Sequence, residues 1–287
     1  MTLLESVLMG IIQGVTEFLP VSSSGHLAIF KSLFHVETPG LLFDILLHVG
    51  TLLAVFVCYY KDIFKMLAEF FKMLADIFFN FTLLFQRKEE KKKRKIVSNG
   101  YRKFDLLVLV TCIPTGIIGV VDSDMVEKAS DILLIPGICL IINSVILFVS
   151  DRLKDGKNGP KETSFTSAFL IGVAQGIATL PGISRSGTTI TACVACGFQR
   201  NFAVKYSFIL SIPTILGSLI FEITDVDLSL VTANEVCNYA VGMLVAALVG
   251  FVCIKTMLVV VRQKKFTYFA VYSLIVGVLS VVGYFAL

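Results

Sequence analysis

The chain has 287 residues, of which 56% are hydrophobic and only 16% are charged, and its mean hydropathy is +0.85. Soluble globular domains carry charge on about a quarter of their residues, so this composition excludes an ordinary soluble domain and predicts a membrane protein. The formal net charge of +4 does not indicate nucleic-acid binding, because the basic residues lie in short segments between apolar runs, where they orient the chain.

The first segment, residues 3–34, is apolar at both ends but is interrupted by the polar stretch "LPVSSSGH" at 19–26. A helix needs about 20 apolar residues to cross a hydrocarbon core of about 30 Å, and neither end is that long. The segment is therefore predicted to form a helix, a polar loop and a second helix that re-enter the membrane from one side.

The next segment predicts a crossing followed by a helix of a different kind. Residues 43–60 are apolar and long enough to cross. Within 62–85 polar residues recur every three or four positions, which is typical of a helix lying in the cytoplasmic interface. The stretch 86–103 carries nine Lys or Arg, so the positive-inside rule predicts a solvated cytoplasmic loop there, with some attraction to anionic lipid heads.

The rest of the chain contains a second broken segment and five further crossings. Residues 165–198 are interrupted by "LPGISRSG" and predict a second re-entrant hairpin. Apolar runs long enough to cross lie at 104–121, 132–149, 202–221, 239–260 and 267–286. The predicted fold is all-α and integral to the membrane, with six transmembrane helices and two re-entrant helix-loop-helix hairpins in a single membrane domain.

The charges of the connecting loops agree with this topology. The loops at 150–164 and 262–265 are basic and are predicted to be cytoplasmic, whereas those at 122–131 and 222–238 are acidic and are predicted to be external. The first hairpin then enters from outside, so a chamber at its loop is expected to open to the external face.

The two broken segments resemble one another at an offset of 162 residues. The matching pairs are Gln13 and Gln175, Gly14 and Gly176, Ser22 and Ser184, Ser24 and Ser186, and Gly25 and Gly187. This similarity predicts an internal duplication into residues 1–150 and 151–287, each with one hairpin and three crossings. Because the hairpins would enter from opposite sides, the repeats have inverted topology, and such repeats commonly place their functional site near the midplane.

Arg185 is the most informative residue of the second loop. A permanently charged guanidinium within an apolar segment needs an anionic partner, and its planar fork of donors suits phosphate. The helix that begins here adds N–H groups that favour an anion. The predicted phosphate-binding residues are Ser184, Arg185, Ser186, Gly187, Thr188 and Thr189. The alternative is that Arg185 pairs with Glu17 in a purely structural bridge.

Glu17 and Gln13 lie four residues apart, on one face of the first helix. Their side-chain oxygens suit a hard divalent cation, Mg²⁺ or Ca²⁺, with a substrate phosphate completing the coordination shell. Two other roles are open for Glu17, because it could act as a general base or could orient His26.

His26 follows a run of serines that includes Ser22 and Ser23. Such a histidine suits proton transfer near neutral pH or direct attack on phosphorus. Two chemistries are open: a serine activated by His26, or His26 itself as nucleophile or leaving-group acid. Some of the serines are alternatively helix caps. The remaining histidines, His35 and His48, are interpreted as interface or packing residues.

Two motifs resemble the signatures of a known family, the integral-membrane undecaprenyl-diphosphate phosphatases of the bacitracin-resistance type. They are "QGVTE", continuing into "FLPVSSSGH", and "PGISRSGTT", and the resemblance extends over essentially the whole chain. The functional positions that it implies are Gln13, Glu17, Ser22, Ser23, His26, Ser184, Arg185, Ser186 and Thr189. Gln13 is the weaker of two residues allowed at its position, so Glu17 must contribute more to holding a metal.

The resemblance implies hydrolysis of undecaprenyl (C55) diphosphate to undecaprenyl phosphate and inorganic phosphate, which recycles the lipid carrier of cell-wall synthesis and confers bacitracin resistance. It implies a multi-pass enzyme of the bacterial plasma membrane, and a homodimer is compatible with the sequence. The alternative is a polyprenyl-phosphate flippase or another transporter, because inverted repeats with broken helices are also found in transporters. A transporter needs an anion-binding residue such as Arg185 but has no use for a nucleophile.

Overall fold

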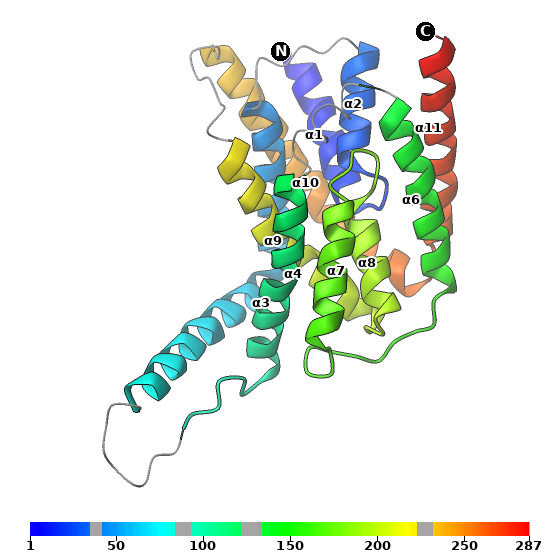
Figure 1. Ribbon diagram of the computed structural model, residues 1–287. Helices are drawn as coiled ribbons and strands as arrows, with labels where there is room; N and C mark the ends of the chain where they lie inside the picture. The colour runs from blue at the N-terminus through cyan, green and yellow to red at the C-terminus, as the bar shows by residue number, and fades with distance from the viewer. Residues whose placement is uncertain (35–41, 84–92, 122–131, 133, 223–231, 287) are drawn as a thin grey trace.

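The computed structural model describes residues 1–287 except 35–41, 84–92, 122–131, 133, 223–231 and 287. The regular secondary structure of the described residues is helical, apart from one isolated bridge between Asn158 and Phe198. The helices are α1 (Leu3–Phe18), α2 (Ser23–Phe34), α3 (Leu42–Thr82), α4 (Gly100–Val121), α6 (Leu134–Arg152), α7 (Phe165–Ile177), α8 (Arg185–Ala195), α9 (Arg200–Glu222), α10 (Ala233–Arg262) and α11 (Phe266–Ala286). The all-α prediction is confirmed for this part of the chain (Figure 1).

Six helices of the described part are long and apolar enough to cross a membrane. They are α3, α4, α6, α9, α10 and α11, which coincide with the six predicted crossings. Each broken segment forms two shorter helices, α1 with α2 and α7 with α8, and the polar stretch of each segment contains the break. The chain is therefore a multi-pass helical membrane protein.

Helix α3 spans 41 residues, but Tyr59 has non-helical backbone angles (φ −118°, ψ 17°), so two helices meet there at a kink. This kink agrees with the predicted change between 43–60 and 62–85. The second half of α3 projects away from the bundle (Figure 1, cyan). Its polar stripe faces α4 in part: Arg102 donates to Glu69 at 3.0 Å and to Asp76 at 2.7 Å. Ion pairs within the chain thus account for part of a stripe that the sequence assigned to the membrane interface. Residues 84–92 of the predicted basic loop lie outside the described residues.

The first helix of each broken segment packs against a long helix from the other half of the chain. Helix α1 packs along α10, and α7 packs along α4. Both crossings are close because glycine lies at the contact: a Cβ on Gly14 would lie 2.8 Å from the Ala246 carbonyl oxygen, and one on Gly172 would meet the Thr111 carbonyl oxygen. Small residues allow such close approach between membrane helices.

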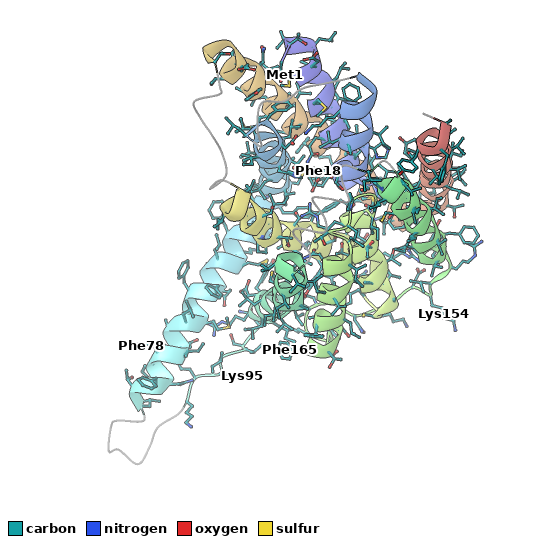
Figure 2. All side chains as sticks on the ribbon, turned by 45° about the horizontal axis from the view of Figure 1, so that its top comes forward. Met1, Phe18, Phe78, Lys95, Lys154 and Phe165 are labelled. Carbon is teal, nitrogen blue, oxygen red and sulfur yellow. The ribbon has the colours of Figure 1, made fainter. Side chains whose placement is uncertain are left out.

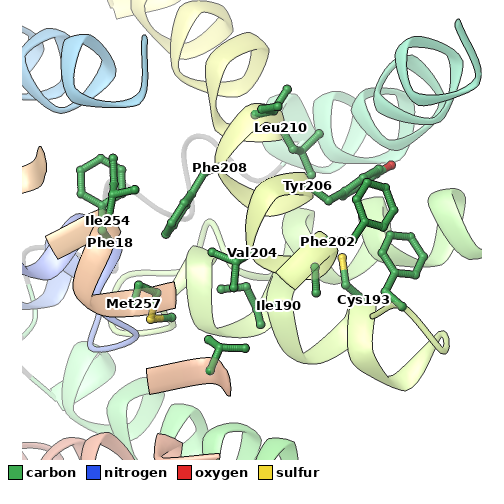
Figure 3. Close-up of a cluster of buried hydrophobic side chains, with 14 of the residues drawn as sticks. Phe18, Ile190, Cys193, Phe202, Val204, Tyr206, Phe208, Leu210, Ile254 and Met257 are labelled. Carbon is green, nitrogen blue, oxygen red and sulfur yellow. The ribbon is translucent and has the colours of Figure 1, made fainter. Parts of the chain in front are cut away.

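The end of α1 is part of an apolar core. Figure 2 shows Phe18, the last residue of α1, in the interior of the bundle. Phe78, on the projecting second half of α3, and Lys95, on the segment that leads to α4, lie far from it. Phe18 packs edge-on against Phe208 of α9 with ring centroids 5.4 Å apart. Side chains of α8 and α10 complete this cluster (Figure 3). The cluster fixes the end of α1, and with it the polar loop that follows.

Candidate active site

The two polar loops meet and bond directly to one another. Ser22 has a positive φ of 72°, and its Oγ accepts hydrogen bonds from the N–H of Gly182 at 3.1 Å and of Gly25 at 3.4 Å. Gly182 lies in the second loop at φ +101°, where a Cβ would meet the Pro136 carbonyl oxygen. Glycine is needed there for both its conformation and its size. Ser22 therefore joins the loops, which is a structural role.

Asn143 of α6 is a second link between the loops. Its fully buried amide donates from Nδ2 to the Pro20 carbonyl oxygen at 3.0 Å and to Ser273 Oγ at 3.3 Å, while its Oδ1 accepts from the Ser184 N–H at 3.1 Å. One side chain thus connects α6, both loops and α11. The sequence analysis missed Asn143, although a lone amide within an apolar span is the signal that could have found it.

Glu17 and Arg185, 168 residues apart in the chain, form an ion pair where the loops meet. Arg185 Nη2 donates to Glu17 Oε1, and Ser23 Oγ donates to Glu17 Oε2 at 2.7 Å. The Glu17 side chain is 3% exposed and that of Arg185 is 23% exposed. The carboxylate is therefore buried, whereas the guanidinium retains an accessible edge.

A small pocket opens beside this ion pair, and we call it the polar pocket. It is lined by Glu17, Phe18, Arg185, Ser186, Ser207, Phe208 and Ser211. The apolar core forms one wall through Phe18 and Phe208, and the N-terminal turn of α8 forms another. A charged donor, a helix N-terminus and hydroxyl groups are the features of an anion site. The predicted phosphate-binding residues Arg185 and Ser186 are thus brought together.

Of the other predicted phosphate-binding residues, Ser184, Gly187 and Thr189 have structural contacts, and Thr188 differs. Ser184 is the N-cap of α8, and its Oγ accepts from the Gly187 N–H at 3.1 Å. Thr189 Oγ1 donates to the Arg185 carbonyl oxygen at 2.8 Å and contacts Ser207 Oγ. Thr188 Oγ1 is buried and has no hydrogen-bond partner among the described residues. These contacts hold the first turn of α8, which positions Arg185.

Gln13 lies between Glu17 and His48. Its Nε2 donates to Glu17 Oε2 at 3.1 Å and lies 3.0 Å from His48 Nδ1, which is itself 3.8 Å from Glu17 Oε2. His48, interpreted as an interface or packing residue, is placed by α3 beside the Glu17 carboxylate, so it has polar neighbours in addition to its packing. An ionisable side chain within an apolar span was the available signal. His35 lies outside the described residues.

His26 makes its hydrogen bonds on the other side of the first loop. Its Nδ1 lies 2.8 Å from the Ser22 carbonyl oxygen and its Nε2 lies 2.8 Å from the hydroxyl of Tyr272 on α11. The two rings are nearly parallel, with centroids 5.6 Å apart. Tyr272 was not predicted, because neither motif includes α11. The structure thus joins Gln13, Glu17, Ser23 and Arg185 in one cluster, and it joins His26 to Tyr272.

These features define a class: a multi-pass helical membrane protein with a buried carboxylate and a partly accessible guanidinium paired where two broken helical segments meet. The chain belongs to the family of bacitracin resistance protein BacA, which it matches over residues 6–279.

Three curated relatives of similar length are each named undecaprenyl-diphosphatase. The protein of Alkaliphilus metalliredigens is 40% identical over 288 residues, covering 100% of both chains. That of Methanosphaera stadtmanae is 34% identical, covering 98% of this chain and 97% of its own. That of Treponema denticola is 38% identical, covering 96% of each.

Proposed function

We infer that the chain hydrolyses undecaprenyl diphosphate to undecaprenyl phosphate and inorganic phosphate, which recycles the lipid carrier of cell-wall synthesis and confers bacitracin resistance. The observation that carries this function is the pair of Glu17 and Arg185 across the two loops, in a chain whose full-length relatives are named undecaprenyl-diphosphatase. A diphosphate brings negative charge into an apolar protein, and a guanidinium at a helix N-terminus supplies the matching charge.

The terminal phosphate is proposed to bind in the polar pocket, against Arg185 and the first turn of α8. Its oxygens would accept hydrogen bonds from the guanidinium that Glu17 holds in the structure. Substrate binding would therefore weaken the ion pair and leave the Glu17 carboxylate ready to accept a proton. The prenyl chain would lie among the apolar spans. In this scheme the ion pair found in the structure is the resting state of the site, and both of its members act in the reaction.

Ser23 is the nucleophile that the contacts support. Its Oγ donates to Glu17 at 2.7 Å, so the carboxylate can take its proton as Oγ attacks the terminal phosphorus. The bond from this phosphorus to the bridging oxygen breaks, and undecaprenyl phosphate leaves with the electron pair. Water then cleaves the phosphoserine and releases inorganic phosphate. His26 is assigned the second proton transfer, at the leaving oxygen or at this water.

A divalent cation, Mg²⁺ or Ca²⁺, is proposed as the cofactor. Gln13 Oε1 is buried and has no hydrogen-bond partner among the described residues, and it lies one helical turn from Glu17. Amide and carboxylate oxygens suit such a cation, and the Gln13 amide, whose Nε2 now donates to Glu17, would turn its Oε1 toward the site to bind one. The described residues contain no cluster of three or more His, Cys, Asp or Glu that could hold a metal ion, so phosphate oxygens would complete the shell. When bound, the ion would neutralise charge on the phosphates.

We also propose that the two broken segments are re-entrant hairpins and that residues 1–150 and 151–287 are inverted repeats. The packing supports this, because α1 on α10 and α7 on α4 are the same contact with the halves exchanged. In Figure 1, α1 and α2 occupy the upper part of the bundle, α7 and α8 occupy the lower part, and their loops face one another. The positive-inside rule would place the basic connection at 153–164 in the cytoplasm and the site toward the outside.

The direct test of the function is phosphate release from a polyprenyl diphosphate by the detergent-purified protein, in Mg²⁺, in Ca²⁺ and with chelator. We expect cation-dependent release by the wild type and strong losses in His26→Ala and Arg185→Ala. Release that persists with chelator would reject the cation but retain the phosphatase. A folded wild type that releases no phosphate would reject the phosphatase and direct attention to lipid transport.

The topology is tested separately by thiol labelling of intact cells. Cys237, near the start of α10, is exposed and should react with a membrane-impermeant maleimide from outside. The Cys237→Ser variant shows how much labelling comes from the other cysteines of the chain. In that background, Lys157→Cys, exposed in the basic connection, should react only after permeabilisation. The reverse pattern would show that the site opens to the cytoplasm.

A further inference from the structure

The contact between His26 and Tyr272 has a defined proton arrangement. A carbonyl oxygen only accepts hydrogen bonds, so the Nδ1 atom that lies 2.8 Å from the Ser22 carbonyl oxygen carries a proton. In a neutral imidazole the other nitrogen then has a lone pair. Nε2 is therefore the acceptor in the 2.8 Å contact with Tyr272, and the phenol hydroxyl is the donor. The ring presents its unprotonated nitrogen to α11.

We propose that Tyr272 is a positioning residue for the phosphatase reaction, which holds His26 with Nε2 as the nitrogen that exchanges a proton. A phenol hydroxyl can both donate and accept. It can donate to neutral Nε2 and, after rotation of its O–H, accept from Nε2–H once His26 is protonated. Tyr272 can thus keep the ring in one orientation through both halves of a proton transfer, while the Ser22 carbonyl holds Nδ1.

The helix that carries Tyr272 is held firmly to the rest of the site. Its neighbour Ser273 is fully buried and bonds to Asn143, the residue that links both loops. Helix α11 also packs closely along α6, where a Cβ on Gly277 would lie 2.8 Å from the Gly137 carbonyl oxygen. These contacts fix the distance between α11 and the first loop. The position of the Tyr272 hydroxyl relative to His26 Nε2 is therefore set by the packing of α11 as well as by α2.

The side chains of His26 and Tyr272 are more exposed than the Glu17 carboxylate. Tyr272 is 45% exposed and His26 is half-buried, whereas the Glu17 carboxylate is buried. The Nε2 side of His26 therefore faces an edge that protein side chains leave uncovered. A proton is exchanged there with the reacting water or phosphate at the single Nε2 lone pair while the phenol O–H is rotated away from it, and the phenol oxygen then accepts from Nε2–H. The catalytic consequence rests on the proposed phosphatase function, but the proton arrangement does not.

Nitrogen spectroscopy tests the arrangement without substrate. The chain has three histidines, so protein labelled with ¹⁵N-histidine gives few signals, and His26→Gln identifies those of His26. We expect neutral His26 to show a protonated Nδ1 and a hydrogen-bonded, unprotonated Nε2. In Tyr272→Phe the Nδ1 proton should remain. The Nε2 chemical shift should move toward that of an unprotonated imidazole nitrogen that accepts no hydrogen bond. A wild-type His26 that carries its proton on Nε2 would overturn the proposal.

Kinetics test the consequence. Tyr272→Phe keeps the ring and removes the hydroxyl, so we expect kcat to fall about tenfold with little change in KM, and the acid side of the pH profile to shift. Tyr268→Phe is the matched control, because Tyr268 lies one turn earlier on α11 and is 72% exposed, and it should leave both readouts unchanged. If Tyr272→Phe is fully active and only Tyr272→Leu loses activity, ring packing is sufficient and the positioning role is wrong.

Discussion

The loop of the first hairpin segment and that of the second share their local hydrogen bonds but not their charges. In the first, Ser22 Oγ accepts from the Gly25 N–H and lies 3.3 Å from Ser24 Oγ. In the second, Ser184 Oγ accepts from the Gly187 N–H and lies 3.2 Å from Ser186 Oγ. Each serine also ends its loop at the start of a helix. The same hydrogen-bond pattern occurs twice, 162 residues apart, although the backbone differs, with φ 72° at Ser22 and −75° at Ser184.

The side chains that differ are those to which the proposed reaction assigns the chemistry. At the same offset Glu17 corresponds to Thr179, Ser23 to Arg185 and His26 to Thr188. The first segment therefore supplies the proposed proton acceptors, and the second supplies the permanent positive charge. Identical charges in both loops would repel one another in a buried site, whereas opposite charges pair there. The comparison teaches that two loops with the same hydrogen-bond pattern can form one site when they carry complementary groups.

The largest expected effect comes from removing the charge of the second loop. Arg185→Ala leaves the buried Glu17 carboxylate without the guanidinium that pairs with it, and it removes the group proposed to donate hydrogen bonds to the phosphate. We therefore expect kcat/KM to fall by about 10³-fold or more. Arg185→Lys keeps the charge but lacks the planar fork, and it should lose less. Initial rates of phosphate release measure both. A loss below tenfold in Arg185→Ala would assign the pair to structure alone.

The two serines of the first loop separate chemistry from structure. Ser23→Ala should lower kcat by about 10²-fold or more, because Ser23 is the proposed nucleophile, and it should also lose about 1–3 kcal/mol of stability, because the buried Glu17 carboxylate loses a donor. Ser22→Ala should keep most activity and lose about 1 kcal/mol of stability, because Ser22 joins the loops. Activity and thermal melts of both variants decide the assignment. Equal rates in Ser23→Ala and wild type would favour direct attack by water or His26.

Asn143 tests whether the two loops depend on a common support. Asn143→Ala removes a buried amide that bonds to Pro20, Ser184 and Ser273. We expect a loss of about 2 kcal/mol in the free energy of unfolding, because a backbone donor and acceptor in the loops lose their partner. Ser144→Ala is the control, since its Oγ bonds only within its own helix, to the Ile141 carbonyl oxygen. Thermal melts in one detergent compare the two, and equal melting temperatures would contradict the shared support.

The two glutamines at equivalent positions test the cation. Gln13→Glu adds a second carboxylate beside Glu17, and the Mg²⁺ concentration for half-maximal rate should fall about tenfold. Gln175→Glu is the matched variant in the second segment, where Nε2 donates to the hydroxyls of Thr115 and Thr214. It should reduce stability and leave the cation dependence unchanged. A shift in both variants, or in neither, would remove Gln13 from the cation site.

The smallest effect concerns the connection between the halves. Asp155 accepts from Arg200 Nε at 2.6 Å and pairs with Lys264 at 3.1 Å, and the hydrogen bond from Arg200 lowers the pKa of this carboxyl. Such a carboxylate stabilises the fold above its ordinary pKa of about 3.9, and that contribution is lost as pH falls through the lowered value. Asp155→Asn should lower the melting temperature by about 1–2 °C at pH 7, because exposed ion pairs contribute little. The difference should shrink below pH 4.

The sequence by itself determined the six spans, the two breaks and the residues of both motifs. Hydropathy is a property of about 20 consecutive residues, so a crossing can be recognised before any contact is known. The same pattern located the change of character within α3 to a few residues, and the structure has the kink between its two helical parts at Tyr59.

Only the tertiary structure decided which of these groups meet. It paired Glu17 with Arg185 and brought His48 to Gln13, Asn143 to both loops and Tyr272 to His26. His48, Asn143 and Tyr272 lie outside both motifs. Each comes from a span whose hydropathy shows only that the helix crosses the membrane. The rotation and depth of a membrane helix depend on close packing against its neighbours, as at Gly14 and Gly277, and hydropathy does not record them.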